Sequence, residues 1–284
     1  MNKILACIDG SDYAQSVCDH AAWAAGRLEV PVEIVHALGR RETSSRPFDL
    51  SGSLELGGRE ALLAELADLD AQKSRLANQR GRLILEQAAA RLRADGVAEV
   101  SERLRSGEVT EAIKEMEPQA RLVVIGKRGE AADFAKGHLG SNLERVVRSM
   151  KKPLLVASRT FQPIERFLVA FDGGRSSPMI VERLLASPLL KDVACHLFMV
   201  GDGAGEAGQR LHAAREQLAA AGYSVTVGIG SGDPETVIAE KVKRDGIGLL
   251  VMGAYGHSRI RNLIVGSTTT ALIQSCTIPV LVIR

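Results

Sequence analysis

Glycine, serine and threonine near the end of the chain are spaced in a way that suits a phosphate group. The apolar run 248–252 leads into Gly253 and Gly256, and after nine further residues come Gly266, Ser267 and Thr268. Glycine lets the backbone approach an anion closely, and a Gly-Ser step into a helix presents N–H groups and hydroxyls at a positive helix end. The pattern predicts a phosphate site, and nucleotide binding is the leading hypothesis.

The first half of the chain repeats this pattern in an altered form. The run 121–125 leads into Gly126 and Gly129, and after ten further residues come Gly140 and Ser141. The loop is one residue longer than its counterpart, which displaces backbone donors by about an ångström or more. Weaker or absent nucleotide binding is therefore expected there. The alternative is a different anionic ligand, attracted by the basic residues of this loop, which are Lys127, Arg128, Lys136 and His138.

Other repeated features indicate two homologous domains. Asp9 and Asp172 each end a short apolar run, and each half closes on a proline followed by an apolar run. The distance from Gly126 to its counterpart Gly253 is 127 residues, whereas the two aspartates are 163 residues apart. The first copy therefore contains about 36 extra residues between its aspartate and its glycine loop. We expect domains over residues 1–159 and 165–284, with the insertion at about 39–75.

The elements that position these residues alternate between strand and helix. Such alternation predicts an α/β fold in which each domain is a five-stranded, doubly wound parallel sheet with helices on both faces. Ligands of such sheets bind at the carboxyl ends of the strands, where the strand order reverses. Asp172 and Gly253 are both expected at such ends. In the second half we expect strands near 166–171, 194–200, 224–229, 248–252 and 278–283, and helices near 177–190, 205–221, 234–245 and 267–275.

The pattern Gly-x2-Gly-x9-Gly-Ser/Thr after a strand, with an aspartate ending the first strand, resembles the ATP-binding class of universal stress proteins. The duplication resembles the tandem members of that family. The resemblance implies an adenine nucleotide alpha-hydrolase-like fold and a site for ATP with Mg²⁺. It assigns Asp172 to the adenine or ribose side and, more loosely, Met199 to the adenine. Met252, Gly253 and Gly256 would line the nucleotide, and Gly266, Ser267 and Thr268 would hold the phosphates. The weaker first-domain counterparts are Asp9, Gly126, Gly129, Gly140 and Ser141.

The composition excludes several other classes of protein. The 284 residues carry a net charge of only +2, with 45% hydrophobic and 25% charged residues, which gives no general basic field for nucleic acid. The sequence has no apolar run of about 18 residues and no amino-terminal leader, so a cytoplasmic protein without a membrane segment is expected.

The four cysteines have no Cys-x-x-Cys spacing. They are interpreted as plain buried thiols, and no metal site is expected.

The insertion contains a long helix, expected from about residue 60 to 94. Leu62, Leu69, Leu76 and Leu83 recur every seven residues along it, with Leu66 between the first two. This spacing puts the leucines on one stripe of the helix. The stripe is expected to cover the core of its own domain. The alternative is that it docks a protein partner or a second copy of the chain, as in a coiled coil, which would make a homodimer.

The closing runs 154–157 and 280–283 are candidates for edge strands, which invite pairing. Single-domain universal stress proteins dimerise through this strand. The resemblance therefore implies that the two halves form an intramolecular pseudo-dimer, with the closing strands antiparallel and the nucleotide sites in separate outer clefts.

Two classes of function fit the residues. The favoured one is a non-catalytic stress-response regulator that binds ATP mainly in its second domain, because the sequence has no Ser-His-Asp set and no paired carboxylates near the glycine loop. An enzyme that slowly hydrolyses ATP or transfers phosphate is the alternative. A scaffold that binds no nucleotide is a further possibility, suggested by Gly174 where the family often has serine.

Overall fold

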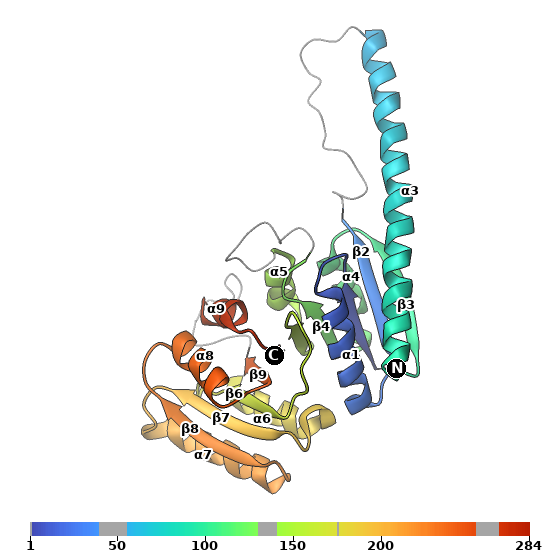
Figure 1. Ribbon diagram of the computed structural model, residues 1–284. Helices are drawn as coiled ribbons and strands as arrows, with labels where there is room; N and C mark the ends of the chain where they lie inside the picture. Colours follow the sequence, from blue (N-terminus) through green and yellow to red (C-terminus); the bar gives the residue numbers. More distant parts are fainter. Residues whose placement is uncertain (1, 40–55, 130–140, 175, 254–266) are drawn as a thin grey trace.

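The computed structural model describes residues 2–39, 56–129, 141–174, 176–253 and 267–284 (Figure 1). Strands and helices alternate throughout. The first half consists of β1 (Lys3–Ile8), α1 (Ala14–Leu28), β2 (Val32–Leu38), α3 (Leu56–Ala94), β3 (Val100–Ser106), α4 (Val109–Met116), the 3₁₀ turn η1 (Glu117–Gln119), β4 (Ala120–Gly126), α5 (Ser141–Ser149) and β5 (Leu154–Ala157). The second consists of β6 (Arg166–Ala170), α6 (Ser176–Ala186), the 3₁₀ turn η3 (Pro188–Leu190), β7 (Ala194–Val200), α7 (Gly205–Ala220), β8 (Val225–Gly230), α8 (Pro234–Arg244), β9 (Leu249–Gly253), α9 (Ser267–Ser275) and β10 (Val280–Ile283).

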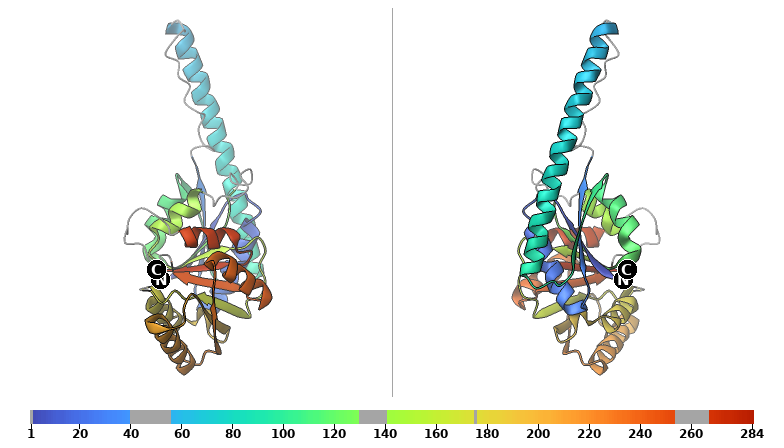
Figure 2. Two further views of the ribbon diagram at one scale, coloured as in Figure 1. Left: turned by 90° about the vertical axis from the view of Figure 1, so that its left-hand side faces the viewer. Right: turned by 90° about the vertical axis from the view of Figure 1, so that its right-hand side faces the viewer.

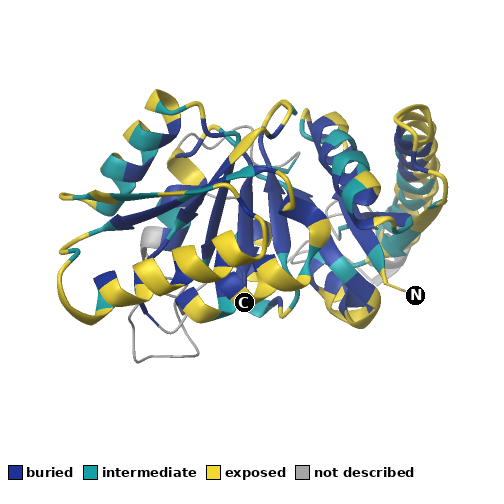
Figure 3. Cartoon of the chain, turned by 90° about the horizontal axis from the view of Figure 1, so that it is seen from below, coloured by how far each residue is buried: buried dark blue, intermediate teal, exposed yellow. Residues whose placement is uncertain are grey.

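All the strands join one ten-stranded sheet, in the order β3-β2-β1-β4-β5-β10-β9-β6-β7-β8. Within each half every pair of neighbouring strands is parallel, so the predicted α/β fold class is confirmed. Helices cover both faces of the sheet, with their buried sides towards it and their exposed sides towards solvent (Figure 3).

Apolar runs with little polar alternation form the strands inside the sheet because both of their faces are buried, whereas the edge strand β3 is largely polar and has no buried residue. In β1, Ile4 and Ala6 belong to the cluster under α1 and α3, whereas Leu5 and Cys7 belong to the cluster under α4 and α5. Strands buried on both sides read as continuous hydrophobic runs. All four cysteines are buried, as expected. Burial raises the pKa of the Cys7 thiol to about 12.

The two halves meet through their closing strands. β5 and β10 are antiparallel, with Leu155 opposite Leu281, and they are the only antiparallel pair among the described strands. The predicted intramolecular pseudo-dimer is therefore confirmed. Because the two strands run in opposite directions, the carboxyl ends of the parallel strands in one half lie at the opposite sheet edge from those in the other.

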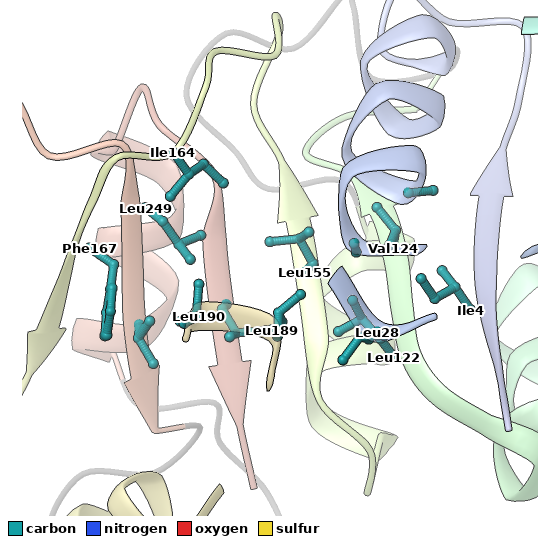
Figure 4. Close-up of a cluster of buried hydrophobic side chains, with 14 of the residues drawn as sticks. Ile4, Leu28, Leu122, Val124, Leu155, Ile164, Phe167, Leu189, Leu190 and Leu249 are labelled. Carbon is teal, nitrogen blue, oxygen red and sulfur yellow. The ribbon is translucent and has the colours of Figure 1, made fainter. Parts of the chain in front are cut away.

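One hydrophobic core continues across this junction (Figure 4). Leu28 and Leu122 from the first half and Leu189 and Leu190 from the second belong to the same buried cluster as Leu155. The guanidinium of Arg27 adds a polar link, since its Nε donates a hydrogen bond of 3.1 Å to the Leu189 carbonyl. The shared core and this hydrogen bond hold the two halves together in addition to the strand pairing.

The elements of the second half lie close to the predicted ranges, with one clear exception. The helix expected over 177–190 ends at Ala186 as α6, and η3 follows. Pro188 disfavours helical backbone at the residue before it and lacks an N–H donor, so the chain turns there. The predicted start of α8 is confirmed, because the Asp233 carboxylate accepts a hydrogen bond of 3.1 Å from the Thr236 amide.

The inserted helix α3 extends far beyond the rest of the molecule (Figures 1 and 2). Its 39 residues correspond to roughly 58 Å at 1.5 Å per residue. Only its carboxyl-terminal part packs on α1, β2 and β3, through buried Leu85, Ala89 and Leu92. At Gly81 an added Cβ would lie 2.7 Å from Leu104 Cδ1, so glycine permits the close approach of helix and sheet. No described helix is both long and apolar enough to cross a membrane.

The expectation that the leucine stripe covers the core of its own domain is wrong. Leu69, Leu76 and Leu83 are 44%, 65% and 58% exposed. The residues that meet the sheet are on another side of the helix, at Gly81, Leu85 and Ala88. Seven-residue spacing predicts a stripe of leucines, but the contacts of the buried end decide which side faces the sheet.

Candidate functional site

The second-domain candidate site is at the carboxyl ends of β6 and β9. These strands are neighbours in parallel register, with Val169 beside Val251, so Asp172 and Gly253 leave the sheet at the same edge. From β6 the chain crosses to β7, and from β9 it crosses in the other direction to β10. This reversal is the switch point at which open α/β sheets bind ligands. The sheet thus brings the predicted Asp172 and Gly253 together.

The Asp172 side chain is fixed by the turn that follows it. Its Oδ1 accepts hydrogen bonds of 2.8 Å from the Gly174 amide and 2.7 Å from the Ser177 hydroxyl. Gly173 has a φ of 64°, in the left-handed region that glycine tolerates best. A Cβ on Gly174 would lie 3.0 Å from Asp172 Oδ2, so glycine leaves room for this carboxylate. The result is an exposed acidic group held in a defined position at the strand end.

The two predicted methionines are buried on opposite faces of the sheet. Met199 belongs to the core cluster on the α6 and α7 face, and Met252 belongs to the cluster on the α8 and α9 face. They are 3% and 5% exposed. The sheet therefore does not bring their thioethers together, and a ligand at the strand ends would meet the backbone near these residues.

Much of the second glycine loop lies outside the described residues, including Gly256 and Gly266. Its end is described, because α9 begins at Ser267 and continues through Thr268 to Ser275. The predicted Gly-Ser step is therefore followed at once by a helix. The first amides of a helix have no partner within it, which makes this position a natural anion site.

The first-domain counterpart has the same strand arrangement. β1 and β4 are parallel neighbours, with Cys7 beside Ile125, and Asp9 Oδ1 accepts a hydrogen bond of 3.0 Å from the Ser11 amide. The described part of the glycine loop lies close to this turn, since a Cβ on Gly129 would be only 2.8 Å from Asp9 Oδ2. Ser141 opens α5, and Gly140 lies outside the described residues.

Tyr13 is a further residue at the first-domain site, and no sequence pattern singled it out. A Cβ on Gly126 would lie 2.8 Å from Tyr13 Cβ, so this residue packs directly on the end of β4. Tyr13 is four residues after Asp9, and the residue four after Asp172 is Ser176. Comparing the two Asp-Gly turns residue by residue would have revealed this difference in size.

Lys127 belongs to the basic loop for which an anionic ligand was the alternative interpretation, and its ammonium contacts the second domain. Lys127 Nζ donates a hydrogen bond of 2.5 Å to the carbonyl of Cys276, directly after the last residue of α9. A cation is favoured at the carboxyl end of a helix. Burial lowers the pKa of Lys127 from its ordinary value to about 8. Lys136 and His138 lie outside the described residues.

A cavity of about 490 Å³ adjoins Asp9, between α1 and the inserted helix α3. Arg80, Gln87 and Arg91 from α3 line one side of it. Arg91 is already paired, since its Nε lies 2.5 Å from Asp19 Oδ1. The sequence did not predict these residues at the site, because the register of α3 on the domain is set by tertiary contacts.

A second cavity, of about 400 Å³, includes Arg121 and Lys152 near the amino ends of β4 and β5, away from the carboxyl ends of these strands.

Comparison with known proteins identifies the family. The sequence profile of the universal stress protein family matches residues 1–158 and again 163–284. The chain belongs to the universal stress protein family. Universal stress protein Slr1230 of Synechocystis sp. (strain PCC 6803) is 38% identical over 287 residues, which covers the full length of both chains.

Solved structures of universal stress proteins share the fold. One from Archaeoglobus fulgidus DSM 4304 aligns with a TM-score of 0.73 at 20% identity, covering all of this chain and 98% of that one. A putative universal stress protein from Pseudomonas aeruginosa UCBPP-PA14 aligns with a TM-score of 0.62 at 16% identity, covering 100% and 93% of the two chains. The likeness therefore extends over both halves of this universal stress protein.

Proposed function

We propose that the chain is a non-catalytic stress-response regulator whose second domain binds ATP with Mg²⁺. The observation that carries the proposal is the position of Asp172 and Gly253 at the carboxyl ends of the neighbouring parallel strands β6 and β9, at the switch point of the sheet. The helix α9 begins immediately after the glycine pattern and would receive the phosphates at its amino end. In the ATP-binding class of this family, an aspartate and a glycine pattern of this spacing form the nucleotide site.

The chemistry of the described residues fits such a ligand. A carboxylate is an acceptor with about four lone-pair positions, so Asp172 suits a donor such as a ribose hydroxyl or the adenine amino group. Gly174 and Ser177 would keep its orientation when the ligand enters. The hydroxyls of Ser267 and Thr268 would add donors for the phosphates, and Mg²⁺ would balance the phosphate charge.

Two differences support a preference for the second domain. In the first domain Tyr13 packs on Gly126, and Lys127 donates to Cys276 of the other half. Each of these contacts uses space or charge that a nucleotide would need. The second copy has a serine at the position of Tyr13. We therefore infer that ATP binds mainly at Asp172.

Calorimetric titration of the purified chain with Mg-ATP tests the proposal. The expected stoichiometry is one strong site per chain. Mass analysis of small molecules released from the purified protein should independently detect an adenine nucleotide. Two equal sites would contradict the preference for the second domain, and the absence of any binding would favour a scaffold role.

Turnover of ATP is expected to be slow, well below the roughly 1 to 1000 per second of typical enzymes. The reason is that the sequence offers no paired carboxylates or Ser-His-Asp set to activate a nucleophile near the glycine loop. Phosphate release from Mg-ATP, measured with the wild type and with Asp172→Ala, checks this. Turnover within the enzymatic range that disappears in Asp172→Ala would instead favour the enzyme hypothesis.

A further inference from the structure

The inserted helix presents leucines to solvent on a segment that projects from the domain. Leu62, Leu69, Leu76 and Leu83 form what we call the leucine stripe. The last three are 44%, 65% and 58% exposed, although they recur at the spacing of a helix–helix seam. A helix surrounded by water is ordinarily polar on its outer side. The stripe therefore has the character of a surface that another helix covers.

Charges along the same helix are separated into two blocks. We call residues 60–70 the acidic block, because they contain four carboxylates and no basic residue, and residues 73–82 the basic block, because they contain four cations and no acidic residue. The two blocks lie on either side of a point between Leu69 and Leu76. The acidic block contains Glu60, Glu65, Asp68 and Asp70, and the basic block contains Lys73, Arg75, Arg80 and Arg82.

This separation of charge favours a second copy of α3 as the partner, in the antiparallel orientation. An antiparallel copy of α3, with the twofold axis between Leu69 and Leu76, brings Leu69 near the partner's Leu76 and Leu62 near the partner's Leu83. In the same arrangement each acidic block faces a basic block. A parallel pair would set acidic against acidic and basic against basic, which is unfavourable. We propose that two copies of the chain form a homodimer through antiparallel pairing of their α3 helices.

The surroundings of the helix permit this pairing. Its outer side stays exposed as far as Leu83, Glu86 and Ala90, beyond the point where the opposite side packs on the domain. Both side views show α3 projecting clear of the two domains (Figure 2). An overlap of about 30 residues would be roughly 45 Å long, enough for about four heptads. The two pairs of globular domains would then lie at opposite ends of the paired helices.

Sedimentation equilibrium of the full chain tests whether the leucine stripe forms the dimer interface. The wild type should have twice the mass of one chain and dissociate on dilution, whereas Leu69→Gln with Leu76→Gln should be a monomer. The matched control is Leu185→Gln with Ile229→Gln, two apolar residues of similar exposure (43% and 47%) on the second domain, which should remain dimeric. Far-UV circular dichroism verifies folding. A monomeric wild type, or a dimer unaffected by the stripe substitutions, would overturn the proposal.

Charge reversal tests the pairing of the blocks. Glu65→Lys with Asp68→Lys replaces two of the four carboxylates of the acidic block by cations, and Arg75→Glu with Arg82→Glu replaces two of the four cations of the basic block by carboxylates. Each variant alone should lose the dimer because like charges then face each other. An equimolar mixture should recover a dimer that contains one copy of each. If the separate variants dimerise as well as the wild type, charge does not govern the association and the proposal fails.

Cysteine crosslinking decides the orientation. In the antiparallel pair two copies of residue 62 would be about 30 Å apart, far beyond the reach of a disulfide. Leu62→Cys and Leu83→Cys should therefore not crosslink alone but should crosslink when mixed. The native cysteines give little background because all four are buried. Efficient crosslinking of Leu62→Cys to itself would show a parallel pair and overturn the proposal.

Discussion

Replacing Gly266 by valine is expected to abolish ATP binding, with a loss of affinity of about 100-fold or more. Gly266 immediately precedes the first residue of α9, where the phosphates would meet the helix amides. A valine side chain would occupy the space needed for close contact between the backbone and phosphate oxygens, and each lost factor of ten corresponds to about 1.4 kcal/mol. Calorimetric titration with Mg-ATP measures the change.

The first domain supplies a matched control. Gly140→Val makes the same substitution immediately before α5 and should leave the ATP affinity unchanged. Thermal unfolding of both variants would separate a local effect from general destabilisation. If Gly140→Val removes the binding and Gly266→Val does not, the nucleotide is in the first domain and the proposed preference is reversed.

Replacing Val282 by proline is expected to weaken the contact between the two halves of the chain. Val282 is 3% exposed and lies between Leu154 of β5 and Met252 of β9. Because β10 has a neighbour on each side, the lost amide removes a bond of the sheet, and proline fits poorly within a central strand. We expect a loss of about 2–4 kcal/mol in the free energy of unfolding, from the missing bond and the unpaired carbonyl. Denaturant unfolding measures this loss.

Val282→Ala separates the role of the amide from that of the side chain. It shortens the same buried side chain but keeps the N–H donor, so it should be the milder variant. Proteolysis within the segment between β5 and β6 should be faster in Val282→Pro than in Val282→Ala. Equal unfolding midpoints and equal cleavage rates would show that the amide of β10 does not contribute to holding the halves together.

The sequence was most informative where local chemistry determines the structure. Continuous apolar runs indicated strands buried on both faces, and Asp233 followed by Pro234 marked the start of α8. Asp172 and Gly253 were predicted at the carboxyl ends of strands, and the parallel register of β6 and β9 places both at the same edge of the sheet. The antiparallel pairing of the closing strands followed from the family resemblance and is confirmed.

Features determined by contacts between distant residues were not predicted. The seven-residue repeat of α3 indicated a stripe, but the stripe faces solvent because Leu85 and Leu92 dock the opposite side. The orientation of Lys127 towards the Cys276 carbonyl depends on how the two halves meet, which no local pattern encodes. Tyr13 could have been noticed by comparing the two repeats, but its contact with Gly126 required the fold.

The antiparallel junction of β5 and β10 has a consequence for how the two copies can evolve. When identical chains pair, every substitution appears on both sides, and dilution separates the pair. Here both halves are in one chain, so their contact is intramolecular and dilution does not separate them. One copy can then diverge without changing the other, as the tyrosine at position 13 and the serine at position 176 illustrate. Joining the halves in one chain thus allows equivalent positions of the two domains to carry different residues.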